Sequence, residues 1–174
     1  ILWNHRWEFD KNPELFFRTL FKLKEEGFDF ELAVLGEKFK DYPDIFNQAK
    51  SLLSKNIVHF GYCSNFKDYA KWLWKADLLP ITSNQDFFGI SIVEAVFCNT
   101  YPILPERLSY TELFNLSSNP NIFYKKDNEL YQKIKKYLSN PSLKKDFKYL
   151  EKFEWKNIST KYDLLFDQLN SKNA

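Results

Sequence analysis

Two acidic residues, Asp86 and Glu94, flank a Phe-Phe-Gly turn in the middle of the chain, with seven residues between them. Glu94 lies in an apolar run that predicts a helix, where a carboxylate is costly unless it faces a cleft or a partner. Gly89 lies where this helix should begin, and exposed amides at a helix N-terminus favour anions. At roughly 1.5 Å per residue the acids would be about 12 Å apart. This span suits a ligand that carries hydroxyl groups at both ends and phosphates between them.

Two cations, Arg6 and Lys11, lie five residues apart after a short apolar segment at 1–4. Both can point at a diphosphate, the arginine as a planar fork and the lysine as a point charge. The alternative is that they are two solvated surface charges.

Two further loops contain a glycine at the end of a predicted strand. Gly36, followed by Glu37, would let the backbone approach a ligand closely, or would form an ordinary tight turn. Gly61 precedes Tyr62, which could face a nucleobase or pack in the turn. Asp86 and Glu94 also have a structural alternative, in which Asp86 caps the helix and Glu94 pairs with a buried cation.

Several catalytic motifs are absent from the sequence. It contains no DxD, Walker, GxGxxG or GxSxG motif, and its two histidines are too few for a zinc cluster. His59 lies inside a predicted strand and is expected to be a core residue. Cys63 and Cys98 fit free thiols rather than a disulfide or a metal site. We therefore expect no metal and no other cofactor.

The bulk composition favours one α/β globular domain with an aromatic core. Of 174 residues, 44% are hydrophobic and 19% aromatic, so a full core can be buried. The net charge of +2 does not demand a nucleic-acid or membrane partner. No run of 18 apolar residues occurs, so no membrane segment is expected, and a reducing, cytoplasmic location fits. Because the chain lacks methionine and opens on an apparent strand, we interpret residues 1–174 as a single domain excised from a longer protein.

Short apolar strands alternate with longer helices along the whole chain. Strands are expected at 1–4, 28–35, 57–60, 78–82, 101–104 and 122–124. Helices are expected at 13–26, 44–54, 65–75, from about 89, at 110–114, at 127–138, and as a pair with a break near 153–155 over 142–169. In the third helix, Phe66, Tyr69, Ala70, Leu73 and Trp74 are expected to face inward. This alternation predicts a Rossmann-like parallel sheet with helices on both faces, and ligands then bind at the carboxyl ends of the strands.

These motifs together resemble the C-terminal, donor-binding half of GT-B glycosyltransferases of family 4. DFFGISIVE at 86–94 is similar to the E-x7-E element of that family, with aspartate in place of the first glutamate. Arg6 and Lys11 match its Arg/Lys pair, and the resemblance covers nearly the whole chain. The segments NHRWEFDKNP at 4–13 and FFGISIVEAVFC at 87–98 further resemble the tRNA-queuosine mannosyltransferase-like group.

The resemblance implies a role for each matching residue. Arg6 and Lys11 would neutralise the donor diphosphate, Asp86 would hold the transferred sugar, and these three form the predicted catalytic set. The predicted donor-binding set comprises Glu94, which would hold the ribose, together with Gly89, Phe88, Ile90, Gly36, Gly61 and Tyr62. The one departure is Asp86, which is one methylene shorter than glutamate, so its reach to the sugar is the weakest part of the match.

The implied activity is retaining, metal-independent sugar transfer from a nucleotide-sugar donor, with GDP-mannose favoured. An N-terminal acceptor domain would be the missing partner, with tRNA as the acceptor of the full-length protein. Two alternatives stay open: a non-catalytic α/β binding module with structural acids, and another GT-B sugar-nucleotide enzyme. Convergence of the cations and the acids on one cleft would favour an enzyme, whereas pairing of Glu94 with a cation away from a cleft would favour the module.

Overall fold

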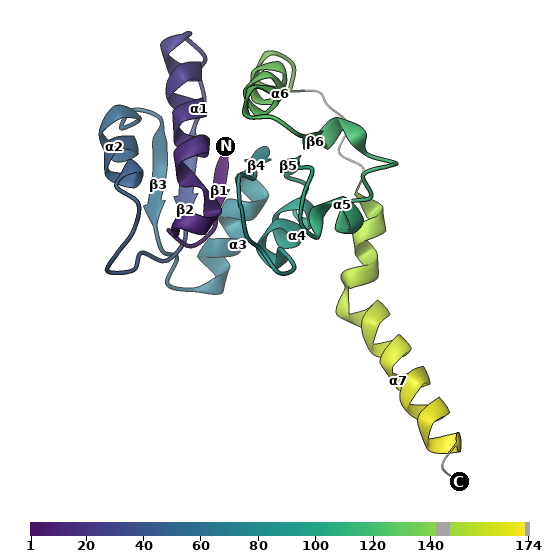
Figure 1. Ribbon diagram of the computed structural model, residues 1–174. Helices are drawn as coiled ribbons and strands as arrows, with labels where there is room; N and C mark the ends of the chain where they lie inside the picture. Colours follow the sequence, from purple (N-terminus) through teal and green to yellow (C-terminus); the bar gives the residue numbers. More distant parts are fainter. Residues whose placement is uncertain (142–146, 173–174) are drawn as a thin grey trace.

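The computed structural model describes residues 1–141 and 147–172 (Figure 1). The strands in these ranges are β1 (Leu2–Asn4), β2 (Leu32–Leu35), β3 (Ile57–Gly61), β4 (Leu78–Pro80), β5 (Tyr101–Pro105) and β6 (Phe123–Tyr124). The α-helices are α1 (Pro13–Glu25), α2 (Ile45–Leu52), α3 (Phe66–Lys75), α4 (Ile90–Phe97), α5 (Tyr110–Leu113), α6 (Asp127–Ser139) and α7 (Trp155–Lys172). Short 3-10 helices are η1 (Phe9–Lys11), η2 (Pro120–Ile122) and η3 (Lys148–Phe153).

The strands form two parallel three-stranded sheets, β1-β2-β3 and β4-β5-β6. β1 lies beside β4, so the order across the molecule is β3-β2-β1-β4-β5-β6. Helices flank the sheets, with α1 packed on α2 and α6, and α3 packed on α4. The predicted Rossmann-like α/β fold is confirmed. The strand order reverses between β1 and β4, which is where such folds open a ligand crevice.

The first helix shows how local sequence sets these elements. Asn12 caps α1 by accepting a hydrogen bond from the Leu15 amide at 3.3 Å, and Pro13 occupies the first helical turn. The buried face of the helix includes Phe16 and Leu20, four residues apart. The predicted start of this helix at residue 13 is therefore confirmed.

The core around β1 is built from aromatic rings, as the composition predicts. Trp3 is 1% exposed and contacts Phe16, Phe17 and Phe46. Trp7, in the loop after β1, stacks on Phe46 with ring centroids 4.4 Å apart. Burial of such rings contributes on the order of 3 kcal/mol each, so this cluster fixes β1 and the loop that follows it.

Two structural predictions were wrong in detail. β2 begins only at Leu32, because the amide of Phe28 bonds to Leu23 O and closes α1, so 28–31 belong to the helix exit. In α3, Phe66 and Trp74 are exposed, not inward. Trp74 directly follows the buried Leu73, and adjacent helical positions point about 100° apart.

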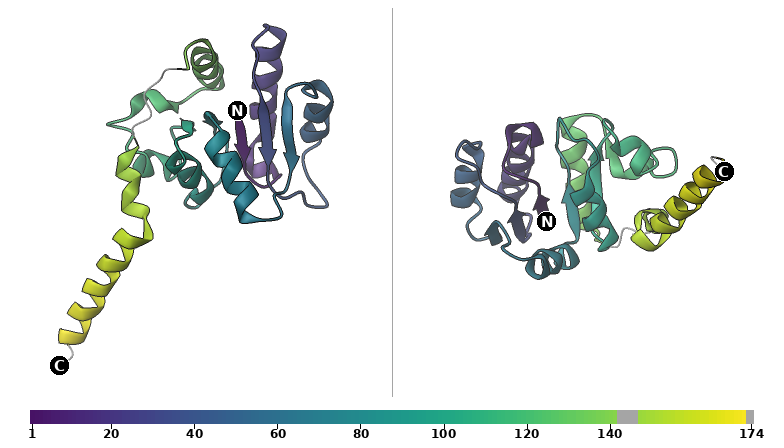
Figure 2. Two further views of the ribbon diagram at one scale, coloured as in Figure 1. Left: turned by 180° about the vertical axis from the view of Figure 1, so that it is seen from behind. Right: turned by 90° about the horizontal axis from the view of Figure 1, so that it is seen from below.

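The C-terminal part leaves the body of the domain. α7 projects away from the sheets in Figures 1 and 2, and its side chains from Tyr162 onward to Ser171 are exposed. The predicted helix break near 153–155 is confirmed, since η3 ends at Phe153 and α7 starts at Trp155. The start of the predicted C-terminal helices, at 142–146, lies outside the described residues. None of the helices in the described ranges combines the length and apolar character needed to cross a membrane.

Candidate functional site

A cavity of about 590 Å³ opens at the carboxyl ends of β1, β2 and β3, opposite the start of α4. This is the point where the strand order reverses. Its lining residues are Asn4, His5, Arg6, Lys11, Leu35, Gly36, Glu37, Tyr62, Cys63, Ser64, Asn65, Phe66, Tyr69, Asp86, Gly89, Ile90, Ser91 and Glu94.

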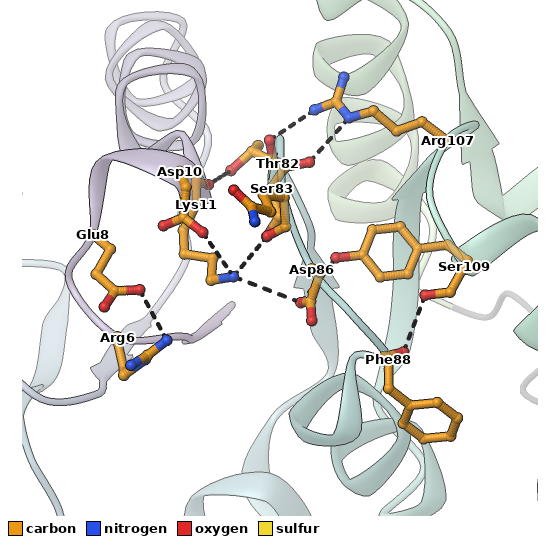
Figure 3. A network of polar contacts seen from close by, with 12 residues as sticks. Arg6, Glu8, Asp10, Lys11, Thr82, Ser83, Asp86, Phe88, Arg107 and Ser109 are labelled. Atoms are coloured by element: carbon orange, nitrogen blue, oxygen red, sulfur yellow. Dashed lines mark hydrogen bonds and ion pairs between the residues drawn. The ribbon is translucent and has the colours of Figure 1, made fainter.

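Most of the predicted site residues line this one cavity. They are Arg6, Lys11, Gly36, Tyr62, Asp86, Gly89, Ile90 and Glu94. Gly61 and Phe88 do not line it. The Phe88 ring turns away from the Lys11–Asp86 cluster in Figure 3 and packs edge-on against Phe153 at 5.5 Å. Tyr62 is 70% exposed at the cavity, so the alternative of a packed turn tyrosine is wrong.

The two predicted cations both line the cavity, but they differ in burial and in their ion-pair partners. Lys11 has only 11% of its side chain exposed; its Nζ donates to Gln85 O at 2.7 Å and lies 3.1 Å from Asp10 and 4.0 Å from Asp86 (Figure 3). Arg6 has 58% of its side chain exposed and pairs with Glu8 at 3.2 Å. Lys11 is therefore a fixed buried charge, whereas Arg6 can reorient toward a ligand at low cost, since exposed ion pairs are weak.

The loop after β4 is bound to the loop after β1, which brings Lys11 and Asp86 together. Thr82 Oγ1 donates to Lys11 O at 2.9 Å, and the Asn84 amide donates to Asp10 O at 2.7 Å. Arg107 supports the same loop by donating to Thr82 O at 2.8 Å. Sequence reasoning missed the two contacts between these loops because each joins residues more than 70 positions apart.

Asp86 is anchored by a buried tyrosine. Tyr110 OH donates to Asp86 Oδ2 at 3.1 Å, and burial raises the pKa of Tyr110, so the hydroxyl remains a donor. The same ring packs below Gly89, where an added Cβ would lie 3.1 Å from Tyr110 Cε1. Asp86 does not cap α4, because the N-cap residue is Gly89, with φ of 86°. The capping alternative for Asp86 is thus wrong.

Glu94 receives a hydrogen bond from a second tyrosine. Tyr69 OH donates to Glu94 Oε2 at 2.7 Å. Within residues 1–141 and 147–172 no lysine, arginine or histidine forms an ion pair with Glu94. The alternative in which Glu94 pairs with a buried cation is therefore wrong, and the carboxylate faces the cavity.

The start of α4 presents backbone donors to the same space. The amides of Ile92 and Val93 bond to Gly89 O, which closes the first turn. The first two helical amides, of Ile90 and Ser91, have no carbonyl four residues back within the helix. Together with the helix dipole they favour a negative group at this end of the cavity, beside Lys11.

Gly36 permits a close approach between the loops after β1 and β2. Its φ is 111°, and an added Cβ would lie 1.9 Å from His5 O. The Trp7 amide donates to Glu37 O at 3.0 Å across the same contact. Gly36 therefore serves a contact between two loops of the protein, and its close approach to a ligand stays a prediction.

His5 is a buried site residue that sequence reasoning missed. It is 7% exposed, and its Nε2 has no hydrogen-bond partner in the part of the chain that the structure describes. Burial lowers its pKa to about 4; Asp86 and Asp10 oppose this shift, whereas the Lys11 charge adds to it. The sequence did contain a signal for His5, because it is a polar residue directly after a predicted buried strand.

The pKa of His5 predicts a loss of stability in acid. The unfolded histidine, with a pKa near 6.5, binds a proton that the folded one excludes, so stability should fall as pH drops from 6.5 toward 4. Between neutral pH and pH 4, the free energy of unfolding of the native chain should fall by about 3 kcal/mol more than that of His5→Gln. Urea unfolding at stepped pH measures this difference. Parallel stability profiles of the two chains would contradict the assignment.

His59 was expected in the core but is only half-buried in β3; Cys63 and Cys98 are half-buried too, and Cys63 lines the cavity. His59 Nε2 lies 3.0 Å from Gly61 O, and Cys63 and Cys98 are free thiols. In the described ranges no group of three or more His, Cys, Asp or Glu side chains is arranged to hold a metal ion. The expected absence of cofactors stays a prediction.

The chain is similar to known proteins over most of its length. Residues 1–152 match the family described as glycosyl transferases group 1. The chain is 32% identical over 163 residues to the tRNA-queuosine alpha-mannosyltransferase of Drosophila melanogaster, covering 92% of this chain and 42% of that protein. It therefore spans less than half the length of this curated relative.

Solved structures show the same fold at low sequence identity. HepE of Anabaena in complex with UDP superposes with a TM-score of 0.72 at 17% identity, covering 98% of this chain and 48% of HepE. The C-terminal domain of a group 1 glycosyl transferase (LpcC) from Francisella tularensis gives a TM-score of 0.69 at 14% identity. The match covers 88% of this chain and 84% of the LpcC chain. The family match covers residues 1–152, and the solved structures share the fold. The chain belongs to the glycosyl transferases group 1 family.

Proposed function

We propose that the chain is the donor-binding domain of a retaining, metal-independent glycosyltransferase. The observation that carries this proposal is the convergence on one cavity of two cations, a helix N-terminus and two acids from separate elements. Each group suits one part of a nucleotide-sugar. A diphosphate is the anion that a buried lysine, an exposed arginine and backbone amides would bind together.

The proposed pose places the ribose at Glu94, the diphosphate between Arg6, Lys11 and the start of α4, and the transferred sugar at Asp86. The nucleobase would lie toward Tyr62, which is exposed at the cavity. The anomeric carbon–oxygen bond to the diphosphate breaks, and a bond to an acceptor oxygen forms. Stabilisation of the departing diphosphate by Arg6 and Lys11 is the main electrostatic contribution.

We further propose mannose as the sugar and GDP as its carrier. The Drosophila relative is named as an alpha-mannosyltransferase acting on tRNA-queuosine, and the motifs of the first loop and α4 resemble that group. An alpha product from an alpha-linked donor corresponds to retention. The acceptor, proposed to be tRNA, and any base for its proton would be bound by an N-terminal acceptor domain of a two-domain protein, in the cytoplasm.

Calorimetry without divalent metal tests the donor site. The 174-residue chain should bind GDP or UDP in EDTA, and Arg6→Ala combined with Glu94→Ala should weaken binding at least about 100-fold, since it removes two charge-assisted contacts. The matched control is Glu14→Ala with Arg18→Ala, an exposed acid–cation pair on α1 outside the cavity. Absence of nucleotide binding by the native chain, or equal binding by the site variant, would refute the proposal.

A further inference from the structure

The hydroxyl of Tyr69 has a defined hydrogen-bond direction. Asn4 Nδ2 donates to Tyr69 OH at 3.1 Å, and Tyr69 OH donates to Glu94 Oε2 at 2.7 Å. A tyrosine hydroxyl has one proton to give, and the Asn4 amide occupies its acceptor side. The proton is therefore directed at the Glu94 carboxylate.

The same asparagine also fixes the helix that carries Glu94. Asn4 Nδ2 donates to Ser91 O at 3.0 Å, in the first turn of α4. The relay Asn4–Tyr69–Glu94 thus joins β1, α3 and α4 on the wall of the cavity that all three side chains line. Burial raises the pKa of Tyr69, and the neighbouring Glu94 carboxylate raises it as well, so the tyrosine stays protonated.

The relay occupies one side of the carboxylate. Among the described residues Tyr69 is the hydrogen-bond donor to Glu94, and it bonds to Oε2. Oε1 has no protein donor in those residues. A carboxylate with one oxygen held by the protein presents the other to a ligand in a fixed orientation, which lowers the cost of ordering it on binding.

We propose that Tyr69 and Asn4 are positioning residues that aim Glu94 at the hydroxyl pair of the donor ribose. This inference rests on the proposed function, in which Glu94 holds that diol. Tyr69 acts through Glu94 and does not itself contact the reacting atoms.

Ribose discrimination is the readout that a merely structural role would not change. Binding of GDP and of 2′,3′-dideoxy-GDP, and of the corresponding uridine nucleotides, is measured by calorimetry for the native chain, Glu94→Gln and Tyr69→Phe. The native chain should prefer the ribonucleotide at least about tenfold, because a hydrogen bond to a charged group is lost with the dideoxy ligand. Glu94→Gln and Tyr69→Phe should reduce this preference to about twofold or less, because they weaken binding of the ribonucleotide more than binding of the dideoxy ligand.

The chain offers a matched control in Tyr131→Phe. Tyr131 OH also donates to a glutamate, Glu26, but that pair joins α6 to α1 outside the cavity. Tyr131→Phe should retain the native ribose preference. If Tyr69→Phe fails to fold, Asn4→Ala replaces it, with an expected loss of about threefold in the preference, because the tyrosine proton is then no longer directed.

The outcomes separate the two proposals. If Glu94→Gln loses the ribose preference and Tyr69→Phe keeps it, the positioning role is wrong and the donor site stands. If Tyr69→Phe weakens both nucleotides equally, its role is structural and the positioning role is again wrong. If the native chain binds both nucleotides equally, the assignment of Glu94 to the ribose is wrong, and the role of Tyr69 is overturned with it.

Discussion

Lys11→Met is expected to weaken GDP and UDP binding at least about 30-fold and to lower the free energy of unfolding by about 2 kcal/mol. Both effects have the same cause. Lys11 is nearly buried beside Asp10 and Asp86, so its removal leaves two carboxylates close together without their cation. It also removes the fixed positive charge beside the start of α4. Calorimetry measures the binding, and urea unfolding measures the stability.

A second substitution separates the two effects of Lys11→Met. Adding Asp10→Asn neutralises one remaining carboxylate, so stability should recover in part while nucleotide binding stays weak. The control is Lys71→Met, which breaks an exposed pair with Asp68 and should cost no more than about 0.5 kcal/mol. Native nucleotide affinity in Lys11→Met would show that the lysine serves only to neutralise the two acids.

Gly36→Ala is expected to lower the free energy of unfolding by at least about 3 kcal/mol, or to prevent folding. The added Cβ would lie 1.9 Å from His5 O, so two loop backbones must separate. The residue would also have to adopt a φ of 111°, which side chains disfavour. Because His5 adjoins Arg6, nucleotide binding should weaken as well. Urea unfolding of the variant measures the loss.

Gly27→Ala provides the matched control for Gly36→Ala. Gly27 also has a positive φ, of 84°, but an added Cβ there meets nothing within 4 Å. It should therefore cost only the backbone strain, about 1 kcal/mol. Equal losses in the two variants would show that the contact with His5 O relaxes without cost.

The fold was largely predictable from the sequence, because it depends on patterns that are local. The cap at Asn12, the apolar spacing of α1 and the order of strands and helices are all encoded within short windows. Exposure was less predictable. Phe66 and Trp74 are large aromatic residues in an amphipathic helix, yet both face solvent, because apolar character alone does not fix which side of a helix meets the core.

The location of the candidate site was predictable from the sequence, but the hydrogen bonds within it were not. Parallel strands deliver their following loops to one edge, so Arg6, Lys11 and the turn at Gly89 could be placed together in advance. The hydrogen-bond partners of Asp86 and Glu94 could not be predicted in this way. Tyr69 and Tyr110 lie 25 and 24 residues from the carboxylates they bond, and no local pattern links such positions.

The shorter acid at position 86 also gains an explanation. Its carboxylate oxygen is held by Tyr110 and lies within ion-pair distance of Lys11. In this chain a nearby tyrosine and lysine therefore set where the carboxylate lies, and side-chain length alone does not decide its reach.

The two three-stranded sheets of the domain meet where β1 lies beside β4. The described strands form two separate ladders, so the two halves of the molecule are joined by loop contacts such as Thr82 to Lys11 and by the packing of α1 on α6 and of α3 on α4. Arg6 and Lys11 belong to one half, and Asp86 and Glu94 belong to the other. A ligand that contacts all four would act as a cross-link between the halves. Binding of this ligand to the native state would raise the free energy of unfolding of the domain. Occupancy of the site and cooperative unfolding would therefore be thermodynamically linked.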